Sequence, residues 1–185
     1  MSFAARVRKQ LNYPKMMSCA ASLAYHGLLG QAEENTCLVL KNVDLTSVPS
    51  EHLAALATWV TSTCRVSIQK VKGIGLTSLL NSLRCGHLLI TFQSLYREET
   101  LGLVQALESS VEGVQLESVT LDMETMVTYS GQGRCREVRL FRGYNEDYEM
   151  WRVNLKEPLK CWAMSRDWAV TAEKQHHLVI KREIK

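Results

Sequence analysis

The sequence predicts an α/β protein, a short solenoid of parallel strands with all its helices on one side of the sheet. Three observations lead to this prediction. An apolar-x-apolar motif occurs five times, its occurrences lie 22 to 28 residues apart, and the residues beside the apolar positions are often polar. A period of this length is typical of repeats that each contain one strand and one helix.

Each predicted strand carries two apolar residues, and the second is its anchor. The motifs are Leu38-x-Leu40, Val66-x-Ile68, Leu88-x-Ile90, Val114-x-Leu116 and Val138-x-Leu140. Because alternate side chains of a strand share a face, the five anchors should stack as one buried ladder. The residues beside the anchors are often polar, which favours a sheet that is covered on one face only. An open, doubly wound α/β domain, covered on both faces, is the alternative.

The chain divides into a basic extension, residues 1–15, and a single α/β repeat domain, residues 16–185. Residues 16–30 are predicted to form a capping helix that ends at Gly30, because small and apolar residues recur there at helical spacing. Pro14 should end any helix in the extension. Five β-α units should follow over residues 37–165. Residues 166–185 read as two strands around a polar turn at 173–175, a hairpin that would close one edge of the sheet.

Residues that favour helix starts mark where the predicted helices begin. Ser47 precedes Pro49, and Ser94, Asp122 and Asn145 stand at the corresponding places in later units. A further helix is predicted from Pro158, with its apolar side chains facing inward.

The segments CLVLKNVDLTSVPSEHLAALATWV and HLLITFQSLYREETLGLVQALESSV resemble leucine-rich repeats. The resemblance is to the longer, helical type found in ribonuclease inhibitor and in the NOD-like receptors, and it covers residues 37–142. The family has Asn or Cys three residues after the anchor. This chain has Val43, Val71, Gln93, Val119 and Gly143 at that position, so a short, degenerate array is expected. The resemblance implies protein binding, in cytosolic sensing or regulation.

Composition argues against two classes of partner. The net charge of +3 is too small for a nucleic-acid-binding protein. No apolar run approaches the roughly 18 residues that span a membrane, and no secretory leader is recognisable. A cytoplasmic protein is therefore expected. The alternative is a small mitochondrial structural subunit, because Arg6, Arg8, Lys9 and Lys15 occur in residues 1–32 without any acid.

The six cysteines contain no C-x-x-C pair, and the smallest gap between two of them is 18 residues. This spacing disfavours a disulfide scaffold or a zinc ribbon. Four of them precede apolar strands and are predicted to be reduced and mostly buried: Cys37, Cys64, Cys85 and Cys135. His176 and His177 are adjacent and would point to opposite faces of a strand, so no metal is predicted.

No catalytic motif supports an enzyme, and no catalytic residue or cofactor is predicted. Walker A and G-x-G-x-x-G sequences are absent. The segment KGIGLTSLL, with Gly73 and Gly75, is interpreted as a tight strand-to-helix turn. The alternative is a nucleotide-binding domain or small-molecule enzyme that uses this turn and the other loops after the strands.

The predicted function is a non-enzymatic module that binds another protein. Its candidate surface is the strand face away from the helices, where the residues beside the anchors should point. The partner-binding residues proposed on it are Lys41, Gln69, Leu89, Thr91, Gln115, Glu117, Arg139 and Phe141. Arg139 and Phe141 are preferred because Arg and aromatic residues dominate binding hot spots. Trp151, Trp162 and Trp168 are interpreted as core, with an aromatic patch for a partner as the alternative.

Overall fold

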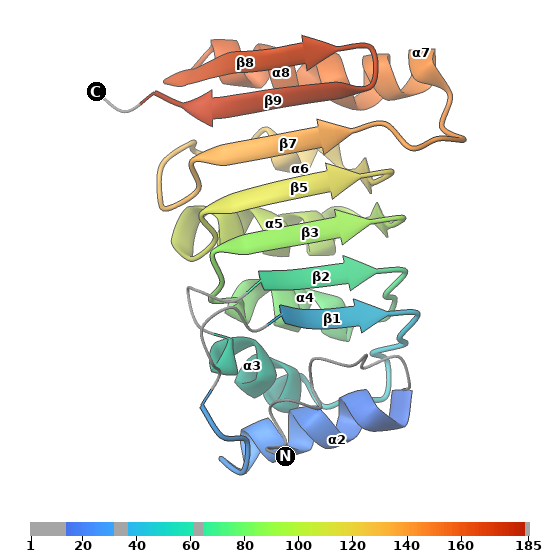
Figure 1. Cartoon of the computed structure of the whole chain (residues 1–185), viewed down its shortest axis with the longest axis vertical. Coiled ribbons are helices and arrows are strands. Elements are labelled where there is room, and N and C mark those ends of the chain that lie inside the picture. The colour runs from blue at the N-terminus through green and yellow to red at the C-terminus, as the bar shows by residue number, and fades with distance from the viewer. Residues whose placement is uncertain (1–13, 32–36, 61–64, 184–185) are drawn as a thin grey trace.

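The computed structural model describes residues 14–31, 37–60 and 65–183 and contains a mostly parallel seven-stranded sheet with helices (Figure 1). The α/β class is thereby confirmed. Five parallel strands follow one another in chain order, without a reversal: β1 (Cys37–Lys41), β2 (Arg65–Gln69), β3 (His87–Thr91), β5 (Gly113–Glu117) and β7 (Glu137–Phe141). The antiparallel strands β9 (His177–Arg182) and β8 (Trp168–Lys174) complete the sheet beside β7.

The predicted anchors form one continuous ladder across the sheet. Leu40 is in register with Ile68, which is followed across the sheet by Ile90, Leu116 and Leu140. Each anchor is at most 1% exposed. The first residues of the five motifs form a second buried row beside the anchors. The predicted ladder is therefore confirmed.

Most of the helices lie behind the sheet in Figure 1, with α3 (Ser50–Trp59) drawn beyond the β1 edge, and they leave the other face of the strands toward the viewer. These helices are α3, α4 (Gly75–Ser82), α5 (Arg97–Ser109), α6 (Met123–Met126), α7 (Tyr148–Trp151) and α8 (Glu157–Met164), with a π-helical turn, η1 (Arg152–Lys156), between the last two. From α3 to α6, each helix packs against the next one along the chain. Within the described residues, no helix combines the length and the apolar character needed to cross a bilayer.

Two short parallel strands, β4 (Ser94–Leu95) and β6 (Thr120–Leu121), pair where the chain bends from the sheet toward the helices. Leu95 and Leu121 are partners in this pairing, and both are buried, as is Leu45 at the equivalent position. The repeat therefore extends past the strand into the bend.

The residue two positions after the anchor adopts a left-handed backbone in four successive units. Asn42, Lys70, Phe92 and Ser118 have φ between 50° and 54°. Asparagine tolerates this conformation, whereas lysine and phenylalanine adopt it rarely. The backbone N–H of Asn42, Phe92 and Ser118 donates to a carbonyl at the end of the next strand, which holds the corner in place.

The N-terminal helix differs from its prediction at both ends. Helix α2 (Pro14–Tyr25) begins at Pro14, because a proline in the first turn of a helix loses no hydrogen bond. The helix ends five residues before Gly30. Gly27 has φ of +67°, and the N–H of Leu28 donates to the carbonyl of Leu23, so Gly27 provides the stop. Helix α2 packs on α3. Residues 1–13 of the predicted extension lie outside the described residues.

Two of the predicted helix starts on the N-terminal side are displaced by two residues. Helix α3 starts at Ser50, with Pro49 rather than Ser47 at the N-cap position. Ser94 pairs in β4, so α5 cannot begin before that short strand ends, and its first residue is Arg97.

Of the two helix starts predicted further along the chain, one is confirmed and one is wrong. Asp122 is at the N-cap position of α6, as predicted. Asn145 is not a cap, because the carboxylate of Asp147 accepts the N–H of Met150 at 2.9 Å and starts α7 there. The helix predicted from Pro158 is α8, which continues from α7 through η1 instead of starting on its own.

The C-terminal unit ends in the predicted hairpin, but its turn is at 175–176, because β8 extends through Lys174. The three tryptophans are 2–4% exposed, which confirms that they belong to the core. The indole N–H of Trp162 donates to the carbonyl of Tyr129 at 3.0 Å, and the two rings stack.

Cys135 is a free thiol, as predicted, and Cys19 and Cys161 are free as well. Cys85 and Cys135 are buried, whereas Cys37 is half-buried. Burial raises the pKa of Cys135 to about 11. Cys64 lies outside the described residues.

Candidate functional site: the exposed face of the sheet

The face of the sheet away from the helices presents three rows of side chains. Strand pairing is in register from β1 to β7, so equivalent residues of neighbouring strands stand side by side. The row nearest the strand starts is Cys37, Arg65, His87, Gly113 and Glu137. The middle row is Val39, Ser67, Leu89, Gln115 and Arg139. The row nearest the strand ends is Lys41, Gln69, Thr91, Glu117 and Phe141.

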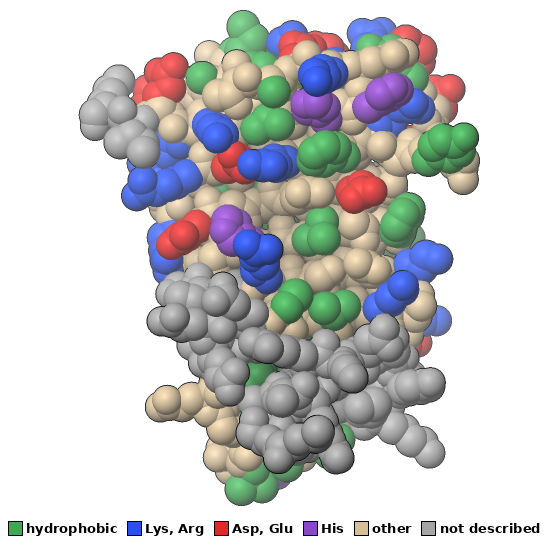
Figure 2. All heavy atoms as spheres, in the orientation of Figure 1, with side chains coloured by type: hydrophobic (Ala, Val, Ile, Leu, Met, Phe, Trp, Pro, Cys, Tyr) green, Lys and Arg blue, Asp and Glu red, His purple; other side chains and the backbone are tan. Residues whose placement is uncertain are grey.

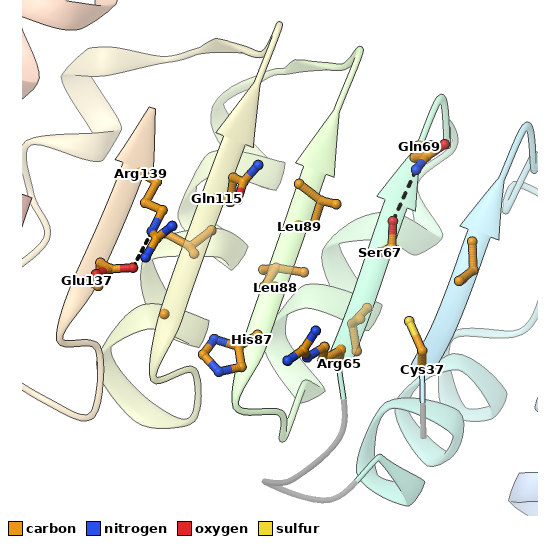
Figure 3. A pocket seen from close by; sticks show the side chains of 14 residues that line it. Cys37, Arg65, Ser67, Gln69, His87, Leu88, Leu89, Gln115, Glu137 and Arg139 are labelled. Carbon is orange, nitrogen blue, oxygen red and sulfur yellow. Dashed lines mark hydrogen bonds and ion pairs between the residues drawn. The ribbon is translucent and has the colours of Figure 1, made fainter. Parts of the chain in front are cut away.

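This face contains a hollow of about 550 Å³, seen close by in Figure 3. All residues of the first and middle rows line it, together with Gln69 from the third row and with Val66, Leu88 and Val114 from the buried row. Two features deepen the middle of the surface. Gly113 has no side chain, and the imidazole of His87 lies next to its Cα, 3.3 Å from where a Cβ would be. Ser67 is only 8% exposed and accepts a hydrogen bond from the Gln69 amide at 3.3 Å.

The charges on this face are unevenly distributed. On the side of β7, Glu137 is hydrogen-bonded to Arg139 and is 2.9 Å from the ammonium of Lys181. Partial burial alone would raise the pKa of Glu137, but these two cations together hold it below its usual range. On the side of β1–β3, the outward side chains include Arg65, Lys41 and His87 but no acid. In the space-filling view, apolar side chains lie between the charged ones (Figure 2).

All eight residues predicted to bind a partner belong to this face. Four of them line the hollow, namely Gln69, Leu89, Gln115 and Arg139. The others belong to the row at the strand ends. The two preferred residues are less free than expected, because Arg139 is ion-paired and Phe141 stacks on His177 with ring centroids 5.5 Å apart.

Thr91 is the exception among the eight, because its side chain is only 4% exposed. Its hydroxyl oxygen has no hydrogen-bond partner among the described residues. Because this hydroxyl is buried and Thr91 does not line the hollow, Thr91 is not available to a partner on this face.

The row at the strand starts was missing from the sequence prediction. Only the residues next to each anchor were chosen, which omitted Arg65, His87 and Glu137. Extending the two-residue alternation by one more step toward the strand start would have found them.

Other sequence candidates do not form a site. Gly73 and Gly75 fit against the preceding unit, where an added Cβ would lie 2.6 Å from the N of Thr46 and 2.4 Å from a methyl of Leu53, respectively. They are therefore glycines of a tight turn, as interpreted. The described residues contain no group of three or more side chains arranged to hold a metal ion. His176 lies in the hairpin turn and His177 in β9.

Comparison with known proteins identifies no relative, since no family model, no curated protein and no solved structure matches this chain.

Proposed function

We propose that this chain is a non-enzymatic protein-binding module, and that its partner binds the exposed face of the sheet. The observation that carries the proposal is a hollow of about 550 Å³ on a sheet face where Figure 1 shows no helix. Its mixture of apolar, amide and charged side chains is typical of protein–protein interfaces. The predicted interaction residues lie together on this face.

The repeat architecture supports the same proposal. The anchors are in register, the strands follow chain order, and the left-handed corner recurs in four units. In one unit the residue three positions after the anchor, where the family has Asn or Cys, joins two neighbouring units, because the Gln93 amide donates to the carbonyl of Ile68 at 3.1 Å. We therefore propose a short leucine-rich-repeat-like solenoid, an architecture in which the face away from the helices binds partners.

The test introduces one charge at the centre of the face. Leu89 lines the hollow and is only partly buried, so Leu89→Glu should leave the fold intact while disrupting apolar contact with a partner. Leu101→Glu is the matched control, because Leu101 is 46% exposed on helix α5. Proteins co-purifying with the tagged wild-type chain should be retained by Leu101→Glu and lost by Leu89→Glu. Equal retention by both folded variants would contradict the proposed surface.

A further inference from the structure

We infer that the partner presents two carboxylates, on either side of an apolar side chain, to the β1–β3 half of the exposed face. The inference rests on the proposed function and specifies the chemistry of the partner. It starts from an imbalance of charge on this half. Its outward side chains include two cations and a histidine without an acid, although the chain as a whole contains 22 basic and 19 acidic residues.

The first cation is Arg65, at the start of β2. Its side chain is exposed, lines the hollow and forms no ion pair within the described residues. The imidazole of His87 is beside it, because these two residues are partners in the register of β2 and β3 (Figure 3). A guanidinium with all its donors available is suited to bind a carboxylate through two parallel hydrogen bonds.

The second cation is Lys41, at the end of β1. It is exposed and, among the described residues, has no acidic partner. Its register partner on β2 is Gln69, four residues beyond Arg65. At roughly 3.3 Å per residue, the two cations are therefore separated by about 13 Å along the strands.

The surface between the two cations is apolar at its centre and has a polar edge. Val39 and Leu89 lie on either side of the small Ser67 in the middle row. Gln69, one row further on, provides the polar edge. A bound segment would place an apolar side chain over Val39 and Leu89.

An extended segment fits this spacing. In a strand, residues i and i+4 lie on the same side about 13 Å apart, with residue i+2 between them. The pattern Glu-x-Leu-x-Glu therefore presents one carboxylate to Arg65, a leucine to the apolar centre and a second carboxylate to Lys41. A nucleic acid is disfavoured, because phosphate binding relies on several cations along the backbone and this half has few.

The experiment selects ligands for the full-length chain from a random displayed peptide library. The acid-x-apolar-x-acid pattern should be enriched on the wild-type chain. Binding of a synthetic Glu-x-Leu-x-Glu peptide, followed by fluorescence anisotropy, should weaken by about tenfold in Arg65→Glu and in Lys41→Glu. The double variant should instead bind the corresponding Lys-x-Leu-x-Lys peptide. The matched control is Arg97→Glu on α5, which changes the net charge equally and should bind as the wild type does.

The outcomes separate this inference from the proposed function. Enriched peptides without acids that are lost in Leu89→Glu would overturn the acidic partner and leave the sheet face as the binding surface. Acidic peptides that bind Arg65→Glu and the wild type equally would overturn the assignment of Arg65. A single-stranded oligonucleotide that binds more tightly than the peptide and depends equally on Arg65 and Lys41 would overturn the acidic segment and identify nucleic acid as the partner. If none of the enriched peptides loses binding in Leu89→Glu, both proposals would be contradicted.

Discussion

Because the ammonium of Lys156 is buried, removing the charge of its partner Glu173 should lower the stability of the last unit. Lys156 comes from η1, and its side chain is only 6% exposed. Its Nζ lies 3.0 Å from a carboxylate oxygen of Glu173 and 3.3 Å from the carbonyl of Lys174, and it approaches the ring of Trp151. Glu173 also accepts a hydrogen bond from Lys160 at 2.7 Å. Glu173→Gln keeps the shape of the side chain and removes the charge that pairs with both lysines.

The expected cost follows from the burial of the two partners. Removing one partner of a fully buried ion pair costs about 3–5 kcal/mol, whereas an exposed pair contributes about 0–1 kcal/mol. Lys156 is buried but Glu173 is 32% exposed, so solvent compensates part of the loss. We expect Glu173→Gln to lower the free energy of unfolding by about 2 kcal/mol at pH 7. Urea unfolding should show a lower midpoint with an unchanged slope.

A second measurement, made in a variant without the buried ammonium, isolates the contribution of the Lys156–Glu173 ion pair. Lys156→Met replaces the buried ammonium by an apolar group of similar length, which is often tolerated. In that background, Glu173→Gln should cost less than about 1 kcal/mol, since only the contact with Lys160 remains. A cost below about 0.5 kcal/mol in the wild-type background would refute the argument, because it lies within the range of exposed pairs.

The same pair predicts a dependence on pH. Hydrogen bonds from Lys160 and then from Lys156 hold the pKa of Glu173 below its usual 4.5. The folded chain therefore releases this proton more readily than the unfolded chain, and the contribution to stability is complete above the unfolded pKa. The stability difference between wild type and Glu173→Gln should shrink as the pH falls below about 4.5 and through the lower folded pKa. A difference that stays constant down to pH 2 would contradict this linkage.

Three further predictions concern the core and the thiols. Leu116→Ala removes a fully buried side chain in the middle of the ladder and should cost about 2–5 kcal/mol in urea unfolding, whereas a cost under about 1 kcal/mol would mean that the ladder is loosely packed. Gly133→Ala should destabilise the fold by at least about 1 kcal/mol, because φ is +72° and the new Cβ would lie 1.8 Å from the carbonyl oxygen of Glu108; circular dichroism melting at wild-type stability would argue against this strain. In native thiol labelling, the exposed Cys161 should react rapidly and the buried Cys135 slowly, and equal rates would contradict the burial of Cys135.

The repeat register could be predicted because its signal is local and periodic. Leu40, Ile90 and Leu116 each follow another apolar residue by two positions, and this alternation specifies which side of a strand is buried. The same pattern specified the opposite face, so the eight residues predicted to bind a partner could be placed on it without a structure, whereas Arg65 and His87 at the strand starts were missed. Helix starts were less predictable, because the preference of Ser94 for an N-cap competes with its pairing in β4.

The backbone corners could not be predicted. Lys70 and Phe92 have left-handed backbones against their own preferences, because the chain must turn there from the sheet toward the bend in every unit. The left-handed conformation is imposed by stacking on neighbouring units, so the residue type at the corner does not indicate it.

The sequence by itself determined the strands and their buried and exposed faces, because these depend on alternation over a few residues. The order of the strands in the sheet was left open by the sequence and came from the tertiary structure. Only the tertiary structure decided which exposed groups meet. Arg65 and His87 are far apart in the chain and become neighbours through the pairing of β2 and β3. Glu137 is neutralised by Arg139 on its own strand and by Lys181 from the hairpin. The availability of a charge depends on which partners pack beside it, and packing is a property of the assembled sheet.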